Sequence, residues 1–330
     1  MRSTYFTPLV PEAKRVLVTG GTGFVGSNLV RRLLDDGHEV GLMVRKGHDP
    51  WRLADVSKQV QRILADLEDG TGLESALAGF KPQWIFHLAA HGAYSWQRDP
   101  VAILKTNVMG TANLVNAGLR IGFEAFVNTG SSSEYGLKDH PPREEEALEP
   151  NSEYAVAKAA ATMYCSQAAR AGKAPIATLR LYSVYGPWEE PQRFIPQLVA
   201  RGLEGRLPPL ASPDTARDYV YISDVCDAYL KVARGTPDPG AVYNVGTGVQ
   251  TTLGQAVELA RRVLRITAEP LWKSMPDRGW DTASWVSDSS KLQERLGWRP
   301  AIDLEHGLQL TADWLSTNPS MNVRYRAASS

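Results

Sequence analysis

Short apolar runs alternate with helical patterns along most of this chain. The runs that predict strands lie at 16–18, 38–44, 60–64, 84–88, 125–129 and 176–182, and later at 218–222 and 242–245. The segments that predict helices lie at 24–34, 99–121, 152–171, 195–201 and 223–233. Strands that are apolar on both faces and separated by helices are typical of a parallel sheet covered on both sides. We therefore expect an α/β protein with a doubly wound parallel sheet.

Glycines end the first strand and open the first helix. In RVLVTGGTGFVG (15–26), Gly21, Gly23 and Gly26 have the G-x-G-x-x-G spacing, and Gly20, Gly23 and Gly26 form a three-residue repeat. Residues without Cβ let the turn close and let a pyrophosphate approach the helix N-terminus, whose N–H groups favour anions. Such a turn can also arise for steric reasons alone. Its place between a strand and a helix favours a dinucleotide (Rossmann) site.

The regular alternation weakens after residue 186, which divides the chain. We expect a dinucleotide-binding domain at 14–186, to which 217–248 returns, and a smaller, loop-rich substrate-binding lobe at 187–216 and 249–330. Residues 1–13 are expected to be a disordered leader. In such a protein the site should lie outside the carboxyl ends of the strands, between the two parts.

Composition excludes several classes of protein. The chain has 330 residues, a formal net charge of zero and no long basic block, which argues against nucleic acid as a partner and favours a small molecule. Cys165 and Cys226 lie far apart without metal-ligand spacing, so we expect neither a disulfide nor a metal site. No run reaches the ~18 apolar residues that span a bilayer, and no signal peptide is evident. We expect a cytoplasmic protein without a membrane partner.

Tyr154 and Lys158 are candidates for proton transfer. On a helix, residues four apart lie on one face, one turn apart. A phenol titrates near ~10, and a neighbouring ammonium favours the phenolate, so the pair could act as a general acid or base. Taken alone, a surface pair on a helix is the simpler interpretation. The segment NTGSSSEYG (128–136) follows a strand, however, and offers three consecutive hydroxyls where an α/β site would be.

Motifs along the chain occur in the order found in extended short-chain dehydrogenase/reductases. They are TGGTGFVG (19–26), HLAA (87–90), TNVMGT (106–111), SSSEYG (131–136), Tyr154-x-x-x-Lys158, LRLYSVYGP (179–187), RDYVYISDV (217–225) and YNVGTG (243–248). Over roughly residues 14–300 the chain resembles a nucleotide-sugar epimerase, dehydratase or ketoreductase of that group. The helices at 99–121 and 152–171 resemble the pair through which such proteins dimerise, so the resemblance implies a homodimer.

The resemblance also implies roles for individual residues. Ser131, Tyr154 and Lys158 match the catalytic residues: Tyr154 would exchange a proton with the sugar, Lys158 would bind the nicotinamide ribose, and Ser131 would bind the reacting oxygen. The implied cofactor contacts are Gly20, Gly23, Phe24, Val25, Gly26, Arg45, Lys46, Asp66, Leu67, Leu88, Ala89, Ala90, Asn107, Tyr154 and Lys158. The implied contacts with a nucleotide-diphosphate sugar are His91, Ser132, Ser133, Ser183, Arg217 and Arg278. Ser183 stands where the family usually has asparagine. His87, inside a strand, is expected to be structural.

Two local patterns bear on the reaction. Dehydratases of this group carry an acid directly after the catalytic hydroxyl residue, whereas here Ser132 and Ser133 follow, and Glu134 comes one position late. SSSEYG is closer to the pattern of 4-keto-6-deoxyhexose reductases. Arg45 and Lys46 follow the second strand, where NAD-preferring members place an acid, so NADP(H) is favoured and NAD(H) remains possible.

A solvated basic turn is an equally good interpretation of Arg45 and Lys46 taken alone. The sequence thus favours an NADPH-dependent 4-ketoreductase. The alternatives are a 4-epimerase with tightly bound NAD and a dinucleotide sensor without turnover. The sensor is disfavoured because sensors of this group tend to lose the tyrosine–lysine pair.

Overall fold

A seven-stranded parallel sheet forms the centre of the protein. The computed structural model describes residues 12–275, 282 and 284–328, so most of the predicted leader and Arg278 lie outside the described residues. The strand order is β10-β6-β5-β4-β1-β2-β3. The strands are β1 (Arg15–Thr19), β2 (Glu39–Val44), β3 (Gln61–Leu64), β4 (Trp84–His87), β5 (Ala125–Ser131), β6 (Ile176–Leu181) and β10 (Ala241–Val245). The chain changes direction across the sheet between β1 and β4, and ligands bind beside such a switch point.

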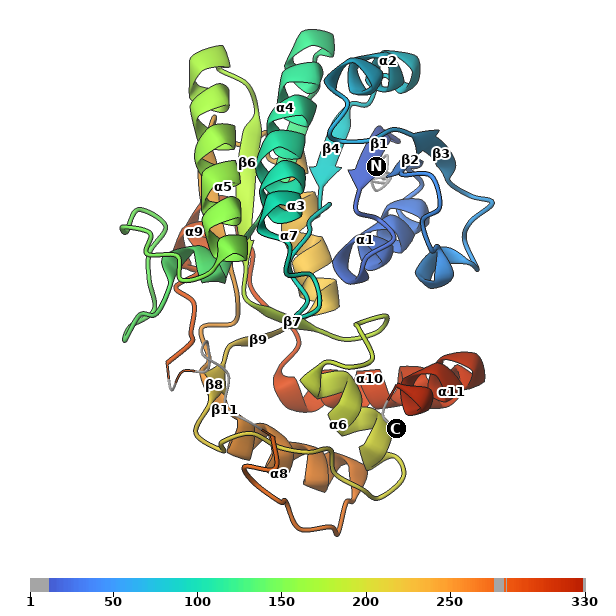
Figure 1. The fold of residues 1–330 in the computed structure, drawn as a ribbon, viewed down its shortest axis with the longest axis vertical. Helices are drawn as coiled ribbons and strands as arrows, with labels where there is room; N and C mark the ends of the chain where they lie inside the picture. Colours follow the sequence, from blue (N-terminus) through green and yellow to red (C-terminus); the bar gives the residue numbers. More distant parts are fainter. Residues whose placement is uncertain (1–11, 276–281, 283, 329–330) are drawn as a thin grey trace, which may run out of the picture.

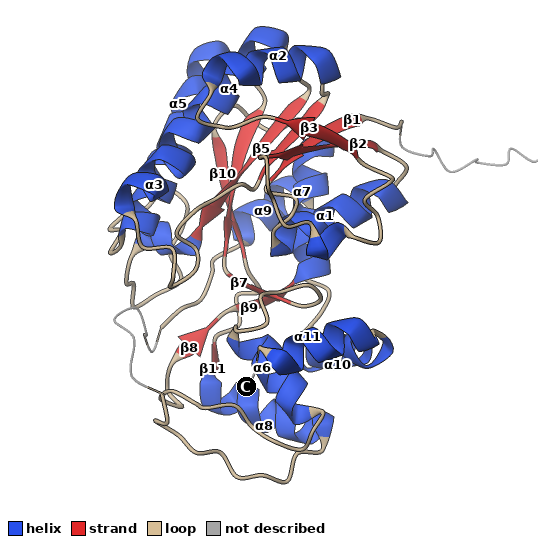
Figure 2. Cartoon of the chain, turned by 45° about the vertical axis from the view of Figure 1, so that its right-hand side comes forward, coloured by secondary structure: helices blue, strands red, loops and turns tan. Residues whose placement is uncertain are grey.

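Helices cover both faces of this sheet (Figures 1 and 2). One face packs against α1 (Phe24–Asp35) and α7 (Ile222–Arg234), and the other against α2 (Gly70–Phe80), α4 (Gly110–Ile121) and α5 (Glu153–Gly172). The side chains of β1 alternate between the two faces of the sheet. Val16 and Val18 pack on the face covered by α1 and α7, and Leu17 packs on the face covered by α2, α4 and α5. The doubly wound sheet expected from the apolar runs is confirmed.

The long helix predicted at 99–121 is interrupted. Asp99 caps α3 (Pro100–Leu104), a wider π-type turn follows at η2 (Lys105–Met109), and α4 then continues to Ile121. Such turns are uncommon and often lie at functional sites. Here the wide turn carries the buried Asn107.

Within its described residues, the smaller part contains two short sheets and four helices. Strands β7 (Ser183–Tyr185) and β9 (Tyr219–Tyr221) pair in parallel, and β8 (Ala216–Arg217) pairs antiparallel with β11 (Thr251–Thr252). The strand predicted at 218–222 is present as β9, and it pairs with β7 outside the seven-stranded sheet. The helices are α6 (Phe194–Gly202), α8 (Leu253–Leu264), α10 (Leu304–Thr317) and α11 (Pro319–Ala327).

This part is more helical than its prolines and tryptophans led us to expect. In α8, Leu253, Ala256, Val257 and Ala260 form one buried stripe, and Thr252 caps the helix reciprocally with Gln255. The same periodic signal was available in the sequence. Helix α9 (Ser290–Leu296), which lies within the predicted lobe, packs instead beside β10 of the main sheet.

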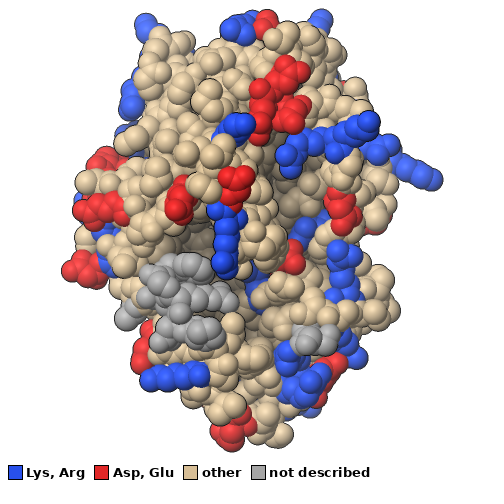
Figure 3. All heavy atoms as spheres, in the orientation of Figure 1, with Lys and Arg blue, Asp and Glu red and all other residues tan. Residues whose placement is uncertain are grey.

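On the face drawn in Figure 3, Lys and Arg side chains lie among Asp and Glu side chains. Within the described residues, no helix is both long enough and apolar enough to cross a membrane.

Candidate active site

A cleft of about 2150 Å³ lies at the carboxyl ends of the central strands, between the sheet and the smaller part. This volume exceeds that of a usual small-molecule pocket, so a dinucleotide and a second ligand fit together. Most of the residues predicted from the sequence line it: Gly20, Gly23, Phe24, Val25, Gly26, Arg45, Lys46, Asp66, Leu67, Leu88, Ala89, Ala90, Ser131, Ser132, Ser133, Tyr154, Lys158, Ser183 and Arg217.

The glycine turn is packed so closely that side chains do not fit. Gly20 has φ +67°, and a Cβ added there would lie 2.4 Å from the Ala89 nitrogen. A Cβ on Gly26 would lie 2.4 Å from the Gly20 carbonyl oxygen. Gly23 is the N-cap residue of α1 and has no side chain that could cap the helix. The first backbone N–H groups of α1 therefore face the cleft without a side-chain acceptor. This cradle fits the pyrophosphate of a dinucleotide.

The end of β2 is basic. Arg45 and Lys46 are exposed, line the cleft and form no ion pair with any described residue. Asp66, after β3, is exposed and accepts a hydrogen bond from the Glu68 N–H at 3.0 Å, and Leu67 beside it is buried. The next helix, α2, is capped by Asp69.

Ser131, Tyr154 and Lys158 meet in the cleft. Ser131 ends β5 and caps the short turn η3 (Ser132–Tyr135), while Ser152 caps α5 just before Tyr154. Burial and the charge of Glu134 raise the pKa of Tyr154 to about 12, while Arg193 and a hydrogen bond with Ser131 oppose that rise. Burial lowers the pKa of Lys158, against the opposing effect of Glu134. The Lys158 ammonium is buried and makes no hydrogen bond to a described residue, so its donors remain for a ligand.

Two predicted contact residues do not line the cleft. The Asn107 side chain accepts from the His91 N–H at 2.8 Å and donates to the His91 carbonyl at 2.7 Å. The amide of Asn107 thus bonds to the backbone of the loop after β4, and Asn107 does not line the cleft. His91 is held by its backbone and likewise does not line the cleft, so the ligand contacts predicted for these two residues stay predictions.

His87 has the structural role expected for it. Its Nδ1 lies 2.7 Å from the Thr19 hydroxyl and its Nε2 lies 2.9 Å from the Thr111 hydroxyl. Complete burial lowers the pKa of His87 to about 3, with Lys158 acting in the same direction. The ring is therefore neutral near pH 7 and ties β1 to α4 beneath the cleft.

The predicted substrate side is built from Ser132, Ser133, Ser183 and Arg217. The Ser133 hydroxyl lies 2.8 Å from that of Ser131. Arg217 donates to the Ala216 carbonyl at 2.7 Å, and its guanidinium lies 5.6 Å from the ring centre of Trp285. Glu134 lies in the short turn η3. Its carboxylate is fully buried and does not line the cleft.

The sequence reasoning missed Glu189, a buried residue at the far wall of the cleft. One of its carboxylate oxygens has no hydrogen-bond partner, and burial raises its pKa to about 8. Its segment is fixed from two sides: Arg52 donates to the Trp188 carbonyl at 2.7 Å and Tyr325 donates to the Glu189 carbonyl at 2.6 Å. Trp188 also has a left-handed backbone, with φ +69°.

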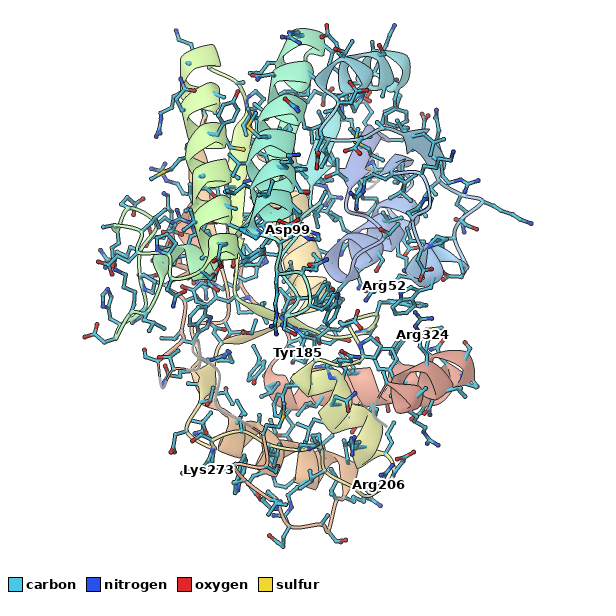
Figure 4. The ribbon with its side chains drawn as sticks, in the orientation of Figure 1. Arg52, Asp99, Tyr185, Arg206, Lys273 and Arg324 are labelled. Carbon is cyan, nitrogen blue, oxygen red and sulfur yellow. The ribbon has the colours of Figure 1, made fainter. Side chains whose placement is uncertain are left out.

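Helix α11 also contacts the segment that contains Glu189. Arg52 and Arg324, labelled close together in Figure 4, both stack on the Trp51 ring, at 4.1 Å and 4.0 Å from its centre. No short motif in the sequence signals these contacts, because they join residues from distant elements.

A second missed feature is the loop after β4. Tyr94 and Trp96 line the cleft and stack on each other, with ring centres 4.7 Å apart and planes 2° from parallel. Tyr94 lies near enough to Tyr154 to raise the pKa of that phenol. The loop therefore brings an aromatic surface beside Tyr154.

Comparisons with known proteins agree with this geometry. Residues 16–246 match the NAD dependent epimerase/dehydratase family. The chain is 33% identical to the UDP-glucose 4-epimerase of Mycolicibacterium smegmatis, over 91% of this chain and 98% of that protein. The structure resembles UDP-glucose 4-epimerase of Thermotoga maritima solved with UDP-glucose, with a TM-score of 0.83 and 28% identity over 92% and 99% of the two chains. It also resembles dTDP-glucose 4,6-dehydratase of Bacillus anthracis in complex with NAD, with a TM-score of 0.82 and 26% identity over 95% and 100%. Because the family match spans most of the chain and includes the strands and turns that build the cleft, the chain belongs to the NAD-dependent epimerase/dehydratase family of extended short-chain dehydrogenase/reductases.

Proposed function

We propose that this protein is an NADPH-dependent enzyme that reduces the C4 ketone of a nucleotide-diphosphate 4-keto-deoxyhexose. The preference for NADPH over NADH is inferred from the basic residues at the end of β2. Arg45 and Lys46 line the cleft there without ion-pair partners among the described residues, and no acidic residue stands at the end of the strand. A 2′-phosphate would meet two cations, whereas the two ribose hydroxyls of NAD would find no carboxylate.

The catalytic residues suit proton donation. With its pKa raised to about 12, Tyr154 keeps its proton at neutral pH and would donate it to the oxygen of the ketone. Ser131 would bind the same oxygen, and Lys158 would bind the ribose next to the nicotinamide. The bound, reduced nicotinamide would supply the hydride.

Elimination of water is disfavoured by the residues around Ser131. Ser132 and Ser133 offer hydroxyls where a dehydratase needs a carboxylate base, and the carboxylate of the same turn, Glu134, is buried in an ion pair with Arg180. Among the described residues of this turn, none can remove a carbon-bound proton.

The second ligand would be a nucleotide-diphosphate sugar. Relatives of similar structure were solved with UDP-glucose, one of them together with NAD. In this chain Arg217 would bind the diphosphate, a role that suits a guanidinium. We assign Arg278 to the same role from the resemblance alone.

A 4-epimerase with bound NAD is the second candidate. It is favoured by the 33% identity to a UDP-glucose 4-epimerase and by several similar structures that hold NAD. It would use the same Ser131, Tyr154 and Lys158, so the choice between the two depends on the cofactor and on net reduction.

Three measurements separate these functions. The freshly purified protein is denatured and any released dinucleotide is identified, the protein freed of dinucleotide is titrated with NADPH and NADH, and NADPH oxidation is followed with 4-keto sugar nucleotides. Clear preference for NADPH with substrate-dependent oxidation supports the reductase. Retained NAD with interconversion of two hexose nucleotides would replace it with the epimerase. In either case Tyr154→Phe should abolish turnover and leave dinucleotide affinity nearly unchanged.

We also propose that the protein forms a homodimer through α3 and α5. Exposed apolar side chains gather on these helices and the turn η2, with exposed fractions of 45–61%: Val101, Leu104, Met109, Val156 and Met163. Contiguous exposed apolar surface of this kind marks protein interfaces. Light scattering should give twice the chain mass, and Met163→Glu should shift it toward the monomer.

A further inference from the structure

Glu134 occupies the junction between the catalytic serine and the catalytic helix. Its side chain is fully buried. One carboxylate oxygen accepts from the Ser131 N–H at 2.8 Å and from the Thr162 hydroxyl at 3.0 Å. The other accepts from Arg180 Nε at 2.8 Å. The carboxylate thus uses both oxygens within the protein.

The positions of Tyr154, Lys158 and Thr162 along α5 connect these hydrogen bonds to the catalytic residues. Thr162 lies one helical turn after Lys158 and two turns after Tyr154, on the same side of α5. The bond from Thr162 to Glu134 and the bond from Ser131 to Glu134 therefore fix the serine relative to the tyrosine and the lysine. A Cβ added at Gly130 would lie 2.7 Å from the Glu134 oxygen, so the strand leaves room for the carboxylate.

The negative charge of Glu134 also acts on both Tyr154 and Lys158. The groups acting on Tyr154 are Glu134, Arg193, Ser131 and Tyr94, and those acting on Lys158 are Glu134 and Cys165. Glu134 is the charged group common to both, and it raises the pKa of each. Arg180 balances it from β6 and is itself held by the Tyr135 hydroxyl at 2.8 Å and the Glu144 carbonyl at 3.2 Å.

We propose that Glu134 is a positioning residue of the reaction: its hydrogen bonds to Ser131 and Thr162 set the distance from Ser131 to the Tyr154–Lys158 helix, and its buried negative charge acts on both Tyr154 and Lys158. This inference rests on the proposed function only in that Tyr154 transfers a proton. It applies equally to a reductase and an epimerase. It explains why a glutamate one position too late for a dehydratase base stands in this turn.

The test compares a substitution that removes the negative charge with one that removes its partner. Glu134→Gln keeps an acceptor for Ser131 and Thr162 but removes the negative charge, whereas Arg180→Gln removes the cation paired with Glu134 and leaves the negative charge in place. The phenol is titrated by ultraviolet difference between each protein and the same protein carrying Tyr154→Phe, which needs no turnover. We expect the apparent pKa of Tyr154 to fall by about one pH unit in Glu134→Gln and to stay unchanged in Arg180→Gln, because Glu134 acts on Tyr154 and Arg180 does not. The basic limb of the kcat/KM profile should move with it.

Thr162→Val is the matched control, because it alters the position of Ser131 relative to α5 without removing a charge. It removes the hydroxyl tie and should lower kcat without moving the phenol titration. If Glu134→Gln does not fold, the double variant Glu134→Gln/Arg180→Gln leaves neither charge buried alone, and it should still shift the phenol downward, because Arg180 is not among the groups acting on Tyr154.

Equal pKa values in all of these proteins, or shifts in the same direction for both single variants, would overturn the role of the charge. Unchanged kcat in Thr162→Val would overturn the positioning. Failure of the proposed reductase would appear separately, as a wild-type protein that titrates as expected but does not oxidise NADPH with any 4-keto sugar nucleotide.

Discussion

Gly26→Ala should damage the dinucleotide site while leaving most of the fold intact. The added methyl group would lie 2.4 Å from the Gly20 oxygen, 2.7 Å from the Gly21 Cα and 2.9 Å from the Gly20 carbon. All three are backbone atoms, so no side chain can rotate away to make room. The turn would have to move relative to α1 by about 1 Å to reach normal contact distance.

The magnitude follows from what the turn does. Overpacking of this kind costs about 1–3 kcal/mol of folding stability. Displacing the turn also misaligns the N–H groups that would bind the pyrophosphate, and a hydrogen bond to a charged group contributes about 1.5–3 kcal/mol. Losing one such bond predicts a roughly 10- to 150-fold weaker binding of the dinucleotide.

The assay is a dinucleotide titration together with thermal unfolding, with Gly79→Ala as the control. Gly79 lies in the last turn of α2, and a Cβ added there meets no atom within 4 Å. The control should bind dinucleotide like the wild type and gain up to about 0.5 kcal/mol of stability, because alanine loses less entropy on folding. Wild-type affinity in Gly26→Ala would refute the assignment of this turn to the pyrophosphate.

Three further outcomes are expected. The pKa of Glu189 is raised from 4.5 to about 8, so the folded protein holds this proton more tightly than the unfolded chain; the stability it contributes is complete below about pH 4.5 and is lost as pH rises through 8. Glu189→Gln should remove up to about 1.4 kcal/mol per pH unit of that decline, measured by denaturant unfolding between pH 5 and 9, and an unchanged slope would contradict it. Trp96→Ala removes an exposed ring stacked on Tyr94 and should weaken binding of a nucleotide sugar but not of the nucleoside diphosphate alone, measured by calorimetry. Asn107→Leu leaves both backbone groups of His91 without their partner, at about 1–3 kcal/mol each, and should reduce kcat and thermal stability together; a loss of kcat without a loss of stability would mean that Asn107 acts on the ligand instead.

Some parts of the site were predictable because they are local. The strands are short apolar runs. The glycine turn can be recognised from glycines close together in the sequence, because its backbone leaves no room for side chains. Tyr154 and Lys158 lie one helical turn apart, so their shared face follows from spacing alone. Ser131 follows from its place at the end of a strand together with the ordered motifs.

Other parts depended on which distant segments meet. The strand predicted at 218–222 has the composition of a main-sheet strand, but β9 pairs with β7 outside that sheet. The amide of Asn107 bonds to the backbone of His91 in the loop after β4, and no spacing in the sequence predicts that contact.

The sequence by itself therefore determined the strands of the sheet, the glycine turn and the shared helix face of Tyr154 and Lys158, since each follows from the period of a strand or a helix or from a glycine's missing side chain. Only the tertiary structure decided the partners of Glu134, Glu189 and Asn107. Their hydrogen bonds and desolvation arise between elements far apart in the chain, and no local pattern encodes which elements the fold brings together.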